Sequence, residues 1–585
     1  MPKFEISQKT RYILLGLVPL LMFEAFAARL FEIQIIEHNE YILKANEERK
    51  KERELLAKRG QIYMMSGENN TVPVVMNERT WTIFVDPSYV GDKNKVQVEL
   101  TKILGEQMIT TWDKVWSNMN NKYVEIARNV NYNTVTKVKE ANLKGVGRKE
   151  TSRRVYPYGT MAAQVLGFIN AEGVGTGVEG SLNKRLTGKD GMLKTVTDVN
   201  SIPLSIGDDN IEIPAVDGED IVLTLDENVQ RKAENEVKAI VNSSNGAVKN
   251  ASVLIMNPNN GRIWAMANYP TYDPGEYYKV EDASVFTNMT TQITYEPASV
   301  CKPFTYAMAI NEGKLNPLDT YYNKGYTMVG NTPVKNASGT ERQVGTRTFR
   351  EALDHSLNTG SIEALRKIGG ENIPKSARRV MYDYLYNRFA LGHKTGIEVY
   401  EEAGNIYSPD HEEGNAVRYS NMTFGQGMAL TMVQVAAGFS AIINGGDYYQ
   451  PTIIAGTMKD DKFVPEPERA PTHQAISPET SATMRDMLQE VRRVNSGEGD
   501  LRGYNIGVKT GTAETYDDQG KYTSKRTNVG AIGYGGSAKE GAMPEYVILV
   551  RMEANAALWG RNAVPSFTEL SNYMLQYLRI EPVIK

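Results

Sequence analysis

The sequence predicts an α+β fold, in which two strand-rich segments enclose a long and mainly helical stretch. Strand patterns lie at residues 252–268 and 504–552, and helical patterns fill much of the interval between them. The chain has 585 residues, of which 41% are hydrophobic and 23% charged, and this is enough for two to four domains with sizeable cores. An apolar segment near the N-terminus, residues 12–28, stands apart from the rest of the composition.

The apolar segment predicts a transmembrane anchor that follows a cytoplasmic N-terminus at residues 1–11. In a helix, residues 12–28 reach roughly 25 Å, the short end of a bilayer span. Basic residues precede the segment, which favours a cytoplasmic start and places the bulk of the chain outside the membrane. Glu24 and Pro19 weaken this interpretation. Two alternatives stay open: a cleaved signal peptide, because Ala25-Phe26-Ala27 resembles a cleavage site, and a buried core helix.

Residues 29–215 predict a stalk followed by a pedestal. A helical pattern from Arg29 to Lys58 contains a dense run of mixed charges, which is typical of a solvated helix face. From residue 59 onward short strands and helices alternate, including a strand at 80–85. We expect this elongated α+β pedestal to contribute little chemistry and to set the height of the following domain above the membrane.

The C-terminal domain is predicted to span residues 216–585. A strand pattern at 222–225 ends at Asp226, a residue type that favours the N-cap of a helix. The pattern then predicts a helix at 228–240. A closing helix is predicted at 566–578, where apolar residues recur at helical spacing.

Ser299 and Lys302 form the first of three motifs in this domain that point to a serine nucleophile. Pro297 precedes them and can open a helix, because its missing N–H would be unpaired there. The spacing of three places both side chains on one helical face, where a desolvated lysine amine can take the hydroxyl proton. Alone, this spacing is more typical of an ordinary helix start, so the prediction depends on the other two motifs.

The second motif is Ser356-Leu357-Asn358, in which the two polar side chains can face a cleft while Leu357 faces the core. The third motif begins at Lys509, which follows a strand-like run at 504–508. The residues that come next are Thr510, Gly511 and Thr512. A cation, two hydroxyls and an accessible backbone edge therefore line up in one place.

A second Lys-Thr-Gly sequence, at residues 394–396, competes with the one at 509–511. It follows a loop-like approach, whereas 509–511 leads to further strand patterns at 528–534 and 546–550. We assign the chemistry to residues 509–511 and predict a loop at 394–396.

Together these motifs resemble those of the penicillin-binding transpeptidases, in which the same trio occurs. Other segments are also similar to that family: residues 257–267, 269–274, 423–427 and 444–446, with 154–159 and 177–180 resembling the pedestal of class B members. The resemblance implies a five-stranded antiparallel sheet flanked by helices, with a helical subdomain inserted between its opening and closing strands. Ala298, Val300 and Cys301 depart from the usual family residues, but none of these changes removes a catalytic group.

The resemblance implies a peptidoglycan D,D-transpeptidase that works through a serine acyl-enzyme. Ser299 is expected to attack the penultimate D-alanine carbonyl of a stem peptide, with Lys302 as its base. Backbone N–H groups of Ser299 and Thr512 are expected to form the oxyanion hole. An amine of a neighbouring stem then takes the acyl group, and a cross-link results.

The remaining motif residues receive roles from the same resemblance. Ser356 is expected to pass a proton to the departing D-alanine, and Asn358 to orient the substrate amide and Lys302. Lys509 and Thr510 are expected to hold the terminal carboxylate of the substrate. Gly511 and Thr512 complete the predicted substrate-binding residues.

Two alternative functions remain open. Water in place of the amine would give a D,D-carboxypeptidase or β-lactamase, but no E-x-x-x-N signal for a general-base carboxylate lies between Asn358 and Lys509. A membrane-tethered β-lactam sensor would keep an acylatable serine, but it needs a signalling module. The eleven residues before the predicted anchor leave no room for one.

The expected partners follow from the resemblance and from the composition. They are peptidoglycan stem peptides, β-lactams, the membrane and a separate membrane glycosyltransferase. A net charge of −4 and a pI near 6.0 give no indication of nucleic acid. Five histidines without metal-ligand spacing predict no metal site, and no cofactor is expected. The single cysteine, Cys301, excludes an internal disulfide and is interpreted as a buried thiol.

Overall fold

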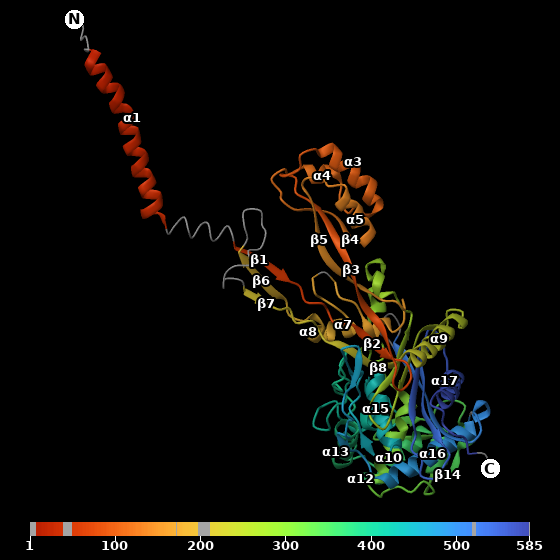
Figure 1. Cartoon of the computed structure of the whole chain (residues 1–585). Helices are drawn as coiled ribbons and strands as arrows, with labels where there is room; N and C mark the ends of the chain where they lie inside the picture. Colours follow the sequence, from red (N-terminus) through yellow and green to blue (C-terminus); the bar gives the residue numbers. More distant parts are fainter. Residues whose placement is uncertain are drawn as a thin grey trace. The chain divides into compact units, whose positions relative to one another are not determined.

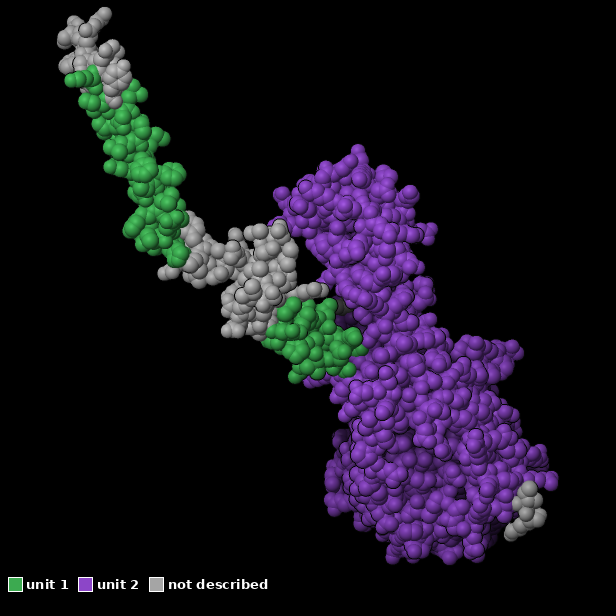
Figure 2. Space-filling model, in the orientation of Figure 1, with its two compact units in different colours: residues 1–59, 187–218 green, residues 60–186, 219–585 purple. Residues whose placement is uncertain are grey.

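The computed structural model describes residues 8–38, 50–170, 172–196, 211–495, 497–516 and 522–583 (Figure 1). The chain divides into two compact units. The smaller unit comprises residues 1–59 and 187–218, and the larger comprises residues 60–186 and 219–585 (Figure 2).

The smaller unit contains helix α1 (Gln8–Phe31), a short π-helix (Glu32–Ile36) and a three-stranded antiparallel sheet. The sheet has the order β1 (Lys50–Leu55), β6 (Gly191–Val196), β7 (Ile211–Ile213). The prediction that the helical stalk continues to Lys58 is therefore wrong at residues 50–55. Mixed charge indicates solvation but does not specify the backbone, and the hydrogen bonds with β6 decide the conformation here.

Within the described residues, no helix is long and apolar enough to cross a membrane. The predicted transmembrane anchor at residues 12–28 is thus not supported, although α1 covers these residues as a helix. Pro19 lies inside that helix and Glu24 interrupts its apolar run. Phe23 and Phe26 are exposed on α1, so the alternative of a buried core helix is wrong.

The larger unit contains a seven-stranded mixed sheet. Six of its strands follow the order β17 (Lys462–Pro465), β16 (Ile454–Lys459), β8 (Asp220–Asp226), β2 (Ile62–Met65), β3 (Thr71–Val85), β4 (Val124–Val130). The seventh strand, β5 (Val146–Val155), pairs with β3. Strands β2 and β8 run parallel, while the other pairs are antiparallel. The predicted strand at 80–85 is confirmed as the end of β3. Helices α3 (Lys93–Leu104), α4 (Trp112–Trp116) and α5 (Tyr132–Glu140) bury apolar side chains with the ends of β3 and β4.

The second sheet of this unit is the predicted five-stranded antiparallel sheet. Its order is β10 (Ile263–Tyr269), β9 (Val248–Met256), β21 (Tyr546–Ala554), β20 (Tyr522–Ser537), β19 (Tyr504–Tyr516). Side chains alternate between the two faces of a strand, and both faces of β9 are apolar, as a covered sheet requires. Val253 and Ile255 pack with helices α9 (Glu227–Ser243) and α17 (Val564–Tyr577). Leu254 and Met256 join the core of the helical region.

The helical region lies between β10 and β19 in the chain. Its longer helices are α10 (Lys302–Asn311), α11 (Phe349–Asp354), α12 (Asn358–Gly369), α13 (Lys375–Tyr382), α14 (Ala416–Met422), α15 (Met432–Ile443) and α16 (Pro478–Asn495), with a π-helix at Asp383–Arg388. Four short strands, β11 (Thr320–Asn323), β12 (Tyr326–Val329), β13 (Thr332–Lys335) and β14 (Gly345–Thr348), form two antiparallel pairs, β11 with β14 and β12 with β13. Residues 302–309 of α10 are all buried, because this helix is apolar on nearly every side.

Shorter elements complete the unit. They are α6 (Ala163–Leu166), α7 (Gly177–Ser181), α8 (Asn183–Thr187), β15 (Asp447–Tyr448) and β18 (His473–Gln474). Asp226 caps α9 as predicted, since its carboxylate accepts hydrogen bonds from the N–H groups of Asn228 (2.9 Å) and Val229 (3.1 Å). The Tyr577 hydroxyl, at the end of α17, donates to the same carboxylate at 2.8 Å and so links α17 to the start of α9.

Candidate active site

Ser299 lies on a short 3₁₀ turn, Ala298–Cys301, which continues directly into α10. Pro297 precedes the turn, as the sequence predicted. Ala298 adopts a left-handed conformation with φ of 53°, and its backbone N–H donates to the carbonyl of Gly425 at 3.0 Å. Residues three apart eclipse one another on a 3₁₀ turn, so Ser299 and Lys302 start from the same side of it.

The side chains of Lys302 and Lys509 meet at Ser356. Lys302 Nζ donates to Ser356 Oγ at 3.1 Å and to the Ser356 carbonyl at 2.5 Å. Lys509 Nζ donates to the same Oγ at 2.9 Å and to the Thr510 carbonyl at 3.1 Å. All three sequence motifs therefore contribute to one cluster, although they lie far apart in the chain.

Ser356 and Asn358 do not alternate along an extended segment in the way the sequence predicted. Ser356 has a left-handed φ of 54°, and Asn358 already belongs to the first turn of α12. Leu357 is fully buried, as predicted. The Asn358 amide donates to the Lys335 carbonyl at 3.0 Å, so the structure turns it toward the strand β13. The expected contact between Asn358 and Lys302 is absent from the hydrogen bonds of the described residues.

Both lysine amines are shielded from solvent, with exposed fractions of 0% for Lys302 and 1% for Lys509. Burial lowers the pKa of Lys302 well below its usual value, and the neighbouring Lys509 charge lowers it further. Burial also lowers the pKa of Lys509, to about 7, while Asp354 opposes this shift. The lowered pKa favours the neutral amine of Lys302, which is the form that can accept a proton.

The outer strand β19 places Thr510, Gly511 and Thr512 beside the serine turn. A Cβ on Gly511 would lie 2.8 Å from the Pro297 carbonyl oxygen, so only glycine allows the strand to approach the turn this closely. The Thr512 hydroxyl accepts a hydrogen bond from the Gly560 N–H at 2.7 Å. Because β19 is an edge strand, its outward-facing backbone groups are available to a substrate.

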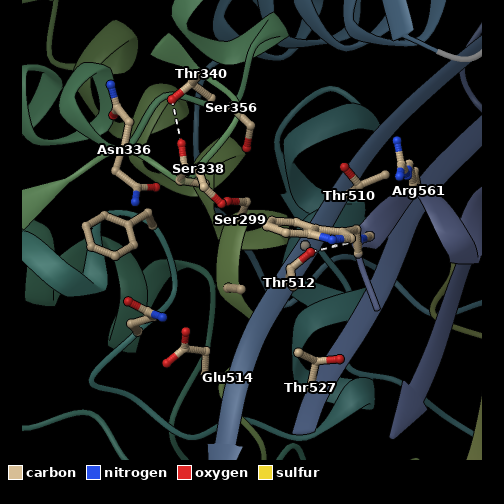
Figure 3. A pocket seen from close by; sticks show the side chains of 18 of the residues that line it. Ser299, Asn336, Ser338, Thr340, Ser356, Thr510, Thr512, Glu514, Thr527 and Arg561 are labelled. Atoms are coloured by element: carbon tan, nitrogen blue, oxygen red, sulfur yellow. Dashed lines mark hydrogen bonds between the residues drawn. The ribbon is translucent and has the colours of Figure 1, made fainter. Parts of the chain in front are cut away.

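A cavity of about 720 Å³ opens above this cluster (Figure 3). The predicted residues that line it are Ser299, Ser356, Asn358, Thr510, Gly511 and Thr512, while Lys302 and Lys509 are buried. The sequence reasoning missed other lining residues: Asn336, Ser338, Thr340, Trp559 and Arg561. Arg561 belongs to a short 3₁₀ helix, Gly560–Ala563, and the others lie in loops. None of these segments has a recognisable motif, so no signal in a single sequence marks them.

The competing Lys-Thr-Gly sequence at 394–396 is a loop, as predicted. The Glu401 carboxylate accepts hydrogen bonds from the N–H and hydroxyl of Thr395, both at 2.9 Å, and from the Gly396 N–H at 2.7 Å. These hydrogen bonds stabilise a turn, and this structural role accounts for Thr395 and Gly396 without a catalytic one.

Cys301 is 1% exposed, and burial raises the pKa of its thiol. A buried thiol of this kind is inert. Among the described residues, no group of three or more histidine, cysteine, aspartate or glutamate side chains is arranged to hold a metal ion.

Comparison with known protein families agrees with this geometry. Residues 251–571 match the family described as "Penicillin binding protein transpeptidase domain". Residues 54–223 match the family described as "Penicillin-binding Protein dimerisation domain". The chain belongs to the penicillin-binding protein transpeptidase family. With both domains present, the prediction of a class B penicillin-binding protein is confirmed.

Several known proteins are similar to this chain over most of their length. Stage V sporulation protein D of Bacillus subtilis is 29% identical, and the match covers 88% of this chain and 78% of that protein. The peptidoglycan D,D-transpeptidase FtsI of Escherichia coli is 26% identical over 90% of this chain and 84% of its own. The crystal structure of penicillin binding protein 3 from Mycobacterium tuberculosis, complexed with aztreonam, superposes with a TM-score of 0.66 at 22% identity, over 91% and 98% of the two chains.

Proposed function

We propose that this penicillin-binding protein is a peptidoglycan D,D-transpeptidase, which joins stem peptides through an acyl-enzyme on Ser299 and releases D-alanine. One observation supports this above the others. Two buried lysine amines lie within hydrogen-bond distance of the same serine hydroxyl, Ser356 Oγ, beneath a cavity that contains Ser299. Such a cluster supplies a neutral base and a proton relay to one nucleophile.

The acylation step assigns a task to each group. Ser299 Oγ bonds to the carbonyl carbon of the penultimate D-alanine, and Lys302 takes the hydroxyl proton. Backbone N–H groups of Ser299 and Thr512 stabilise the oxyanion, each contributing roughly 3–4 kcal/mol. The C–N bond then breaks, and Ser356 passes a proton to the amine of the departing D-alanine.

Substrate binding uses the edge strand. Lys509 and Thr510 hold the terminal carboxylate of the donor, and Gly511 with Thr512 lies along its backbone. Asn358, which also lines the cavity, orients the donor amide. We keep this role for Asn358 because its side chain lines the cavity, while the hydrogen bond to Lys335 fixes its position.

The acyl-enzyme is resolved by an amine of a second stem peptide: its nitrogen bonds to the acyl carbon, the ester bond to Ser299 Oγ breaks, and the proton that the amine loses returns to Ser299 Oγ. β-Lactams resemble the D-alanyl-D-alanine amide and acylate the same serine. Hydrolysis by water and a sensor without turnover remain the competing functions, and the product of the second step distinguishes all three.

We further propose that the catalytic domain works outside the cytoplasmic membrane, where its substrate lies, and that the chain is attached to that membrane. The exposed apolar side chains of α1, such as Leu15 and Phe23, support membrane attachment. Residues 54–223 and 251–571 match a dimerisation domain and a transpeptidase domain, and neither of these polymerises glycan strands. A separate membrane glycosyltransferase is therefore the proposed partner.

Labelling with a fluorescent penicillin tests the nucleophile. Wild-type protein is expected to form a covalent adduct, and Ser299→Ala is expected to form none. Equal labelling of both proteins would refute the assignment of Ser299. Incubation with a donor peptide and an amine acceptor then tests transfer, because a cross-linked dimer is expected in addition to free D-alanine. Release of D-alanine without a dimer would establish hydrolysis instead.

A further inference from the structure

A second cavity, of about 460 Å³, lies next to the active-site cavity. Glu514 of β19 lines both cavities, so the two are neighbours at the end of this strand. The strand pairing is irregular between Glu514 and Thr515, and both residues line the second cavity. Its wall also contains Tyr295, Asn528, Arg551 and Glu553.

Arg551, on β21, supplies a cation with unused donors to this cavity. Its side chain is only 3% exposed, and its guanidinium lies 4.8 Å from the centre of the Tyr295 ring. Nη2 donates to Asn528 Oδ1 at 2.7 Å and lies 3.7 Å from a Glu553 oxygen. Nε has no hydrogen-bond partner among the described residues. A buried guanidinium with an unpaired donor favours a bound anionic oxygen.

The other charged groups of the cavity differ in how fully they are engaged. Arg418 binds the Glu413 carboxylate at 2.5 Å and the Gly427 carbonyl at 3.0 Å, and Glu296 accepts from the Gly427 N–H. Glu553 accepts hydrogen bonds from Asn250 at 2.9 Å and Lys249 at 3.5 Å. Glu514 is exposed at the junction of the two cavities and makes no hydrogen bond or ion pair among the described residues. Arg551 and Glu514 thus offer one positive and one negative group to a ligand.

The direction of the donor peptide brings a particular residue to this place. With its terminal carboxylate at Lys509 and Thr510 and its scissile carbonyl at Ser299, the donor runs back along β19 toward Glu514. An extended chain advances about 3.3 Å per residue, so the residue before the two D-alanines lies near the level of Thr512, and its side chain spans the remaining distance of about 7 Å along the strand to Glu514. Figure 3 shows Ser299 and Thr510 in one part of the active-site cavity and Glu514 well below both of them in this view.

We propose that the second cavity binds the side chain of the donor residue that precedes D-alanyl-D-alanine, and that it selects a diamino-dicarboxylic acid there. The side-chain carboxylate binds the Arg551 guanidinium, and the adjacent ammonium binds Glu514. A lysine side chain satisfies only Glu514 and leaves Arg551 Nε without a hydrogen-bond partner. This inference rests on the proposed transpeptidase function, because the direction of the donor comes from it.

The main experiment compares two donor pentapeptides, with meso-diaminopimelic acid or L-lysine at the third position, by release of D-alanine. Wild-type protein is expected to prefer the diaminopimelate donor about tenfold in kcat/KM, the effect of one charge-assisted contact. In Arg551→Gln this ratio is expected to fall to about one, whereas Arg551→Lys keeps part of it. Arg502→Gln, which makes the same change at an exposed arginine that lines neither cavity, is the control and keeps the wild-type ratio.

Acylation by benzylpenicillin, which has no such side chain, separates the possible failures. Absence of acylation in the wild-type protein counts against the proposed function itself. If Arg551→Gln is acylated and keeps the wild-type ratio of kcat/KM for the two donors, the second-cavity proposal is overturned. A wild-type protein that uses both donors equally overturns it as well. If Arg551→Gln alters the choice among amine acceptors with one fixed donor, the cavity belongs to the acceptor and the proposal is equally overturned.

A second variant keeps the proposal testable if Arg551→Gln does not fold. Glu514 is exposed, so Glu514→Gln is tolerated by the fold. Wild-type protein is expected to prefer the lysine donor over a norleucine donor, which lacks the ammonium, about fivefold, and Glu514→Gln is expected to abolish that preference. Retention of the preference in Glu514→Gln overturns the assigned ammonium contact.

Discussion

Lys302 and Lys509 approach the same oxygen atom from two different elements, at 3.1 and 2.9 Å from Ser356 Oγ. Lys302 begins α10, whereas Lys509 lies in β19, and both amines are buried. Two ammonium groups this close repel each other, so burial and proximity together favour the neutral form of one of them. The Ser356 hydroxyl can accept from one amine and donate to the other, which makes it the link between the base and the substrate-binding cation.

Replacing Ser356 by alanine is expected to break this link. Because a positioned proton carrier contributes about 10²- to 10⁴-fold, the acylation rate with benzylpenicillin is expected to fall by that order. Stopped-flow measurement of the second-order acylation rate checks this. The matched control is Ser440→Ala, a buried serine on α15 whose hydroxyl donates to the Ala436 carbonyl at 2.8 Å. Equal rates for Ser356→Ala and the control would contradict the relay.

The pH dependence of acylation follows from the two lysine pKa values. Lys302 must be neutral to act as the base, so the rate rises as pH increases through its lowered pKa. Lys509 must be protonated to bind a carboxylate, and its pKa of about 7 makes the rate fall above neutral pH. A bell-shaped profile of kcat/KM is expected between pH 4 and 10. A rate that keeps rising through pH 9 would exclude the charged role of Lys509.

The two Lys-Thr-Gly sequences provide an internal comparison. Lys509→Met removes the buried charge but keeps the length of the side chain, and acylation is expected to fall at least about 100-fold. Lys394→Met makes the same change in an exposed loop, and acylation is expected to stay within about twofold. Parallel penicillin-labelling time courses of the two variants measure both effects. Similar losses in both variants would reverse the assignment of the motifs.

The predictable parts of this structure depend on local sequence. The Asp226 cap, the apolar strands of the five-stranded sheet and the turn after Pro297 follow from residue types at neighbouring positions. The convergence of Ser299, Ser356 and Lys509 followed from resemblance to a known family and not from spacing, because nothing local brings positions so distant in the chain together.

The features that sequence reasoning missed depend on distant partners. Residues 50–55 form a strand because β6 lies beside them, at positions near 191–196. Asn358 faces Lys335 because a helix begins at this residue, which changes the direction of its side chain. Asp354, whose pKa burial raises to about 7, opposes the lowered pKa of Lys509, and no local pattern predicts that pair.

Two adjacent arginines allow a test of what holds the pedestal residues in the larger unit. Arg154 binds the fully buried Glu179 at 2.6 Å and the Gly60 carbonyl at 2.9 Å, whereas Arg153 binds the exposed Glu78 at 2.7 Å. Arg154→Ala leaves a buried carboxylate uncompensated, so the free energy of unfolding is expected to fall by about 3–5 kcal/mol. Arg153→Ala breaks a solvated pair and is expected to cost about 0–1 kcal/mol.

Urea unfolding followed by tryptophan fluorescence measures both changes, because Trp81 lies in β3, which pairs with the strand that contains the two arginines. The double variant Arg154→Met/Glu179→Leu is expected to recover most of the loss, since it removes both buried charges and keeps the volume filled. If the single variants lose equal stability, or if the double variant is no better than Arg154→Ala, the destabilisation does not come from an unpaired buried charge. A double variant that is no better than Arg154→Ala would show that the contacts of Arg154 with Gly60 and Asn77 are the dominant contribution, because these are the hydrogen bonds that the double variant cannot restore.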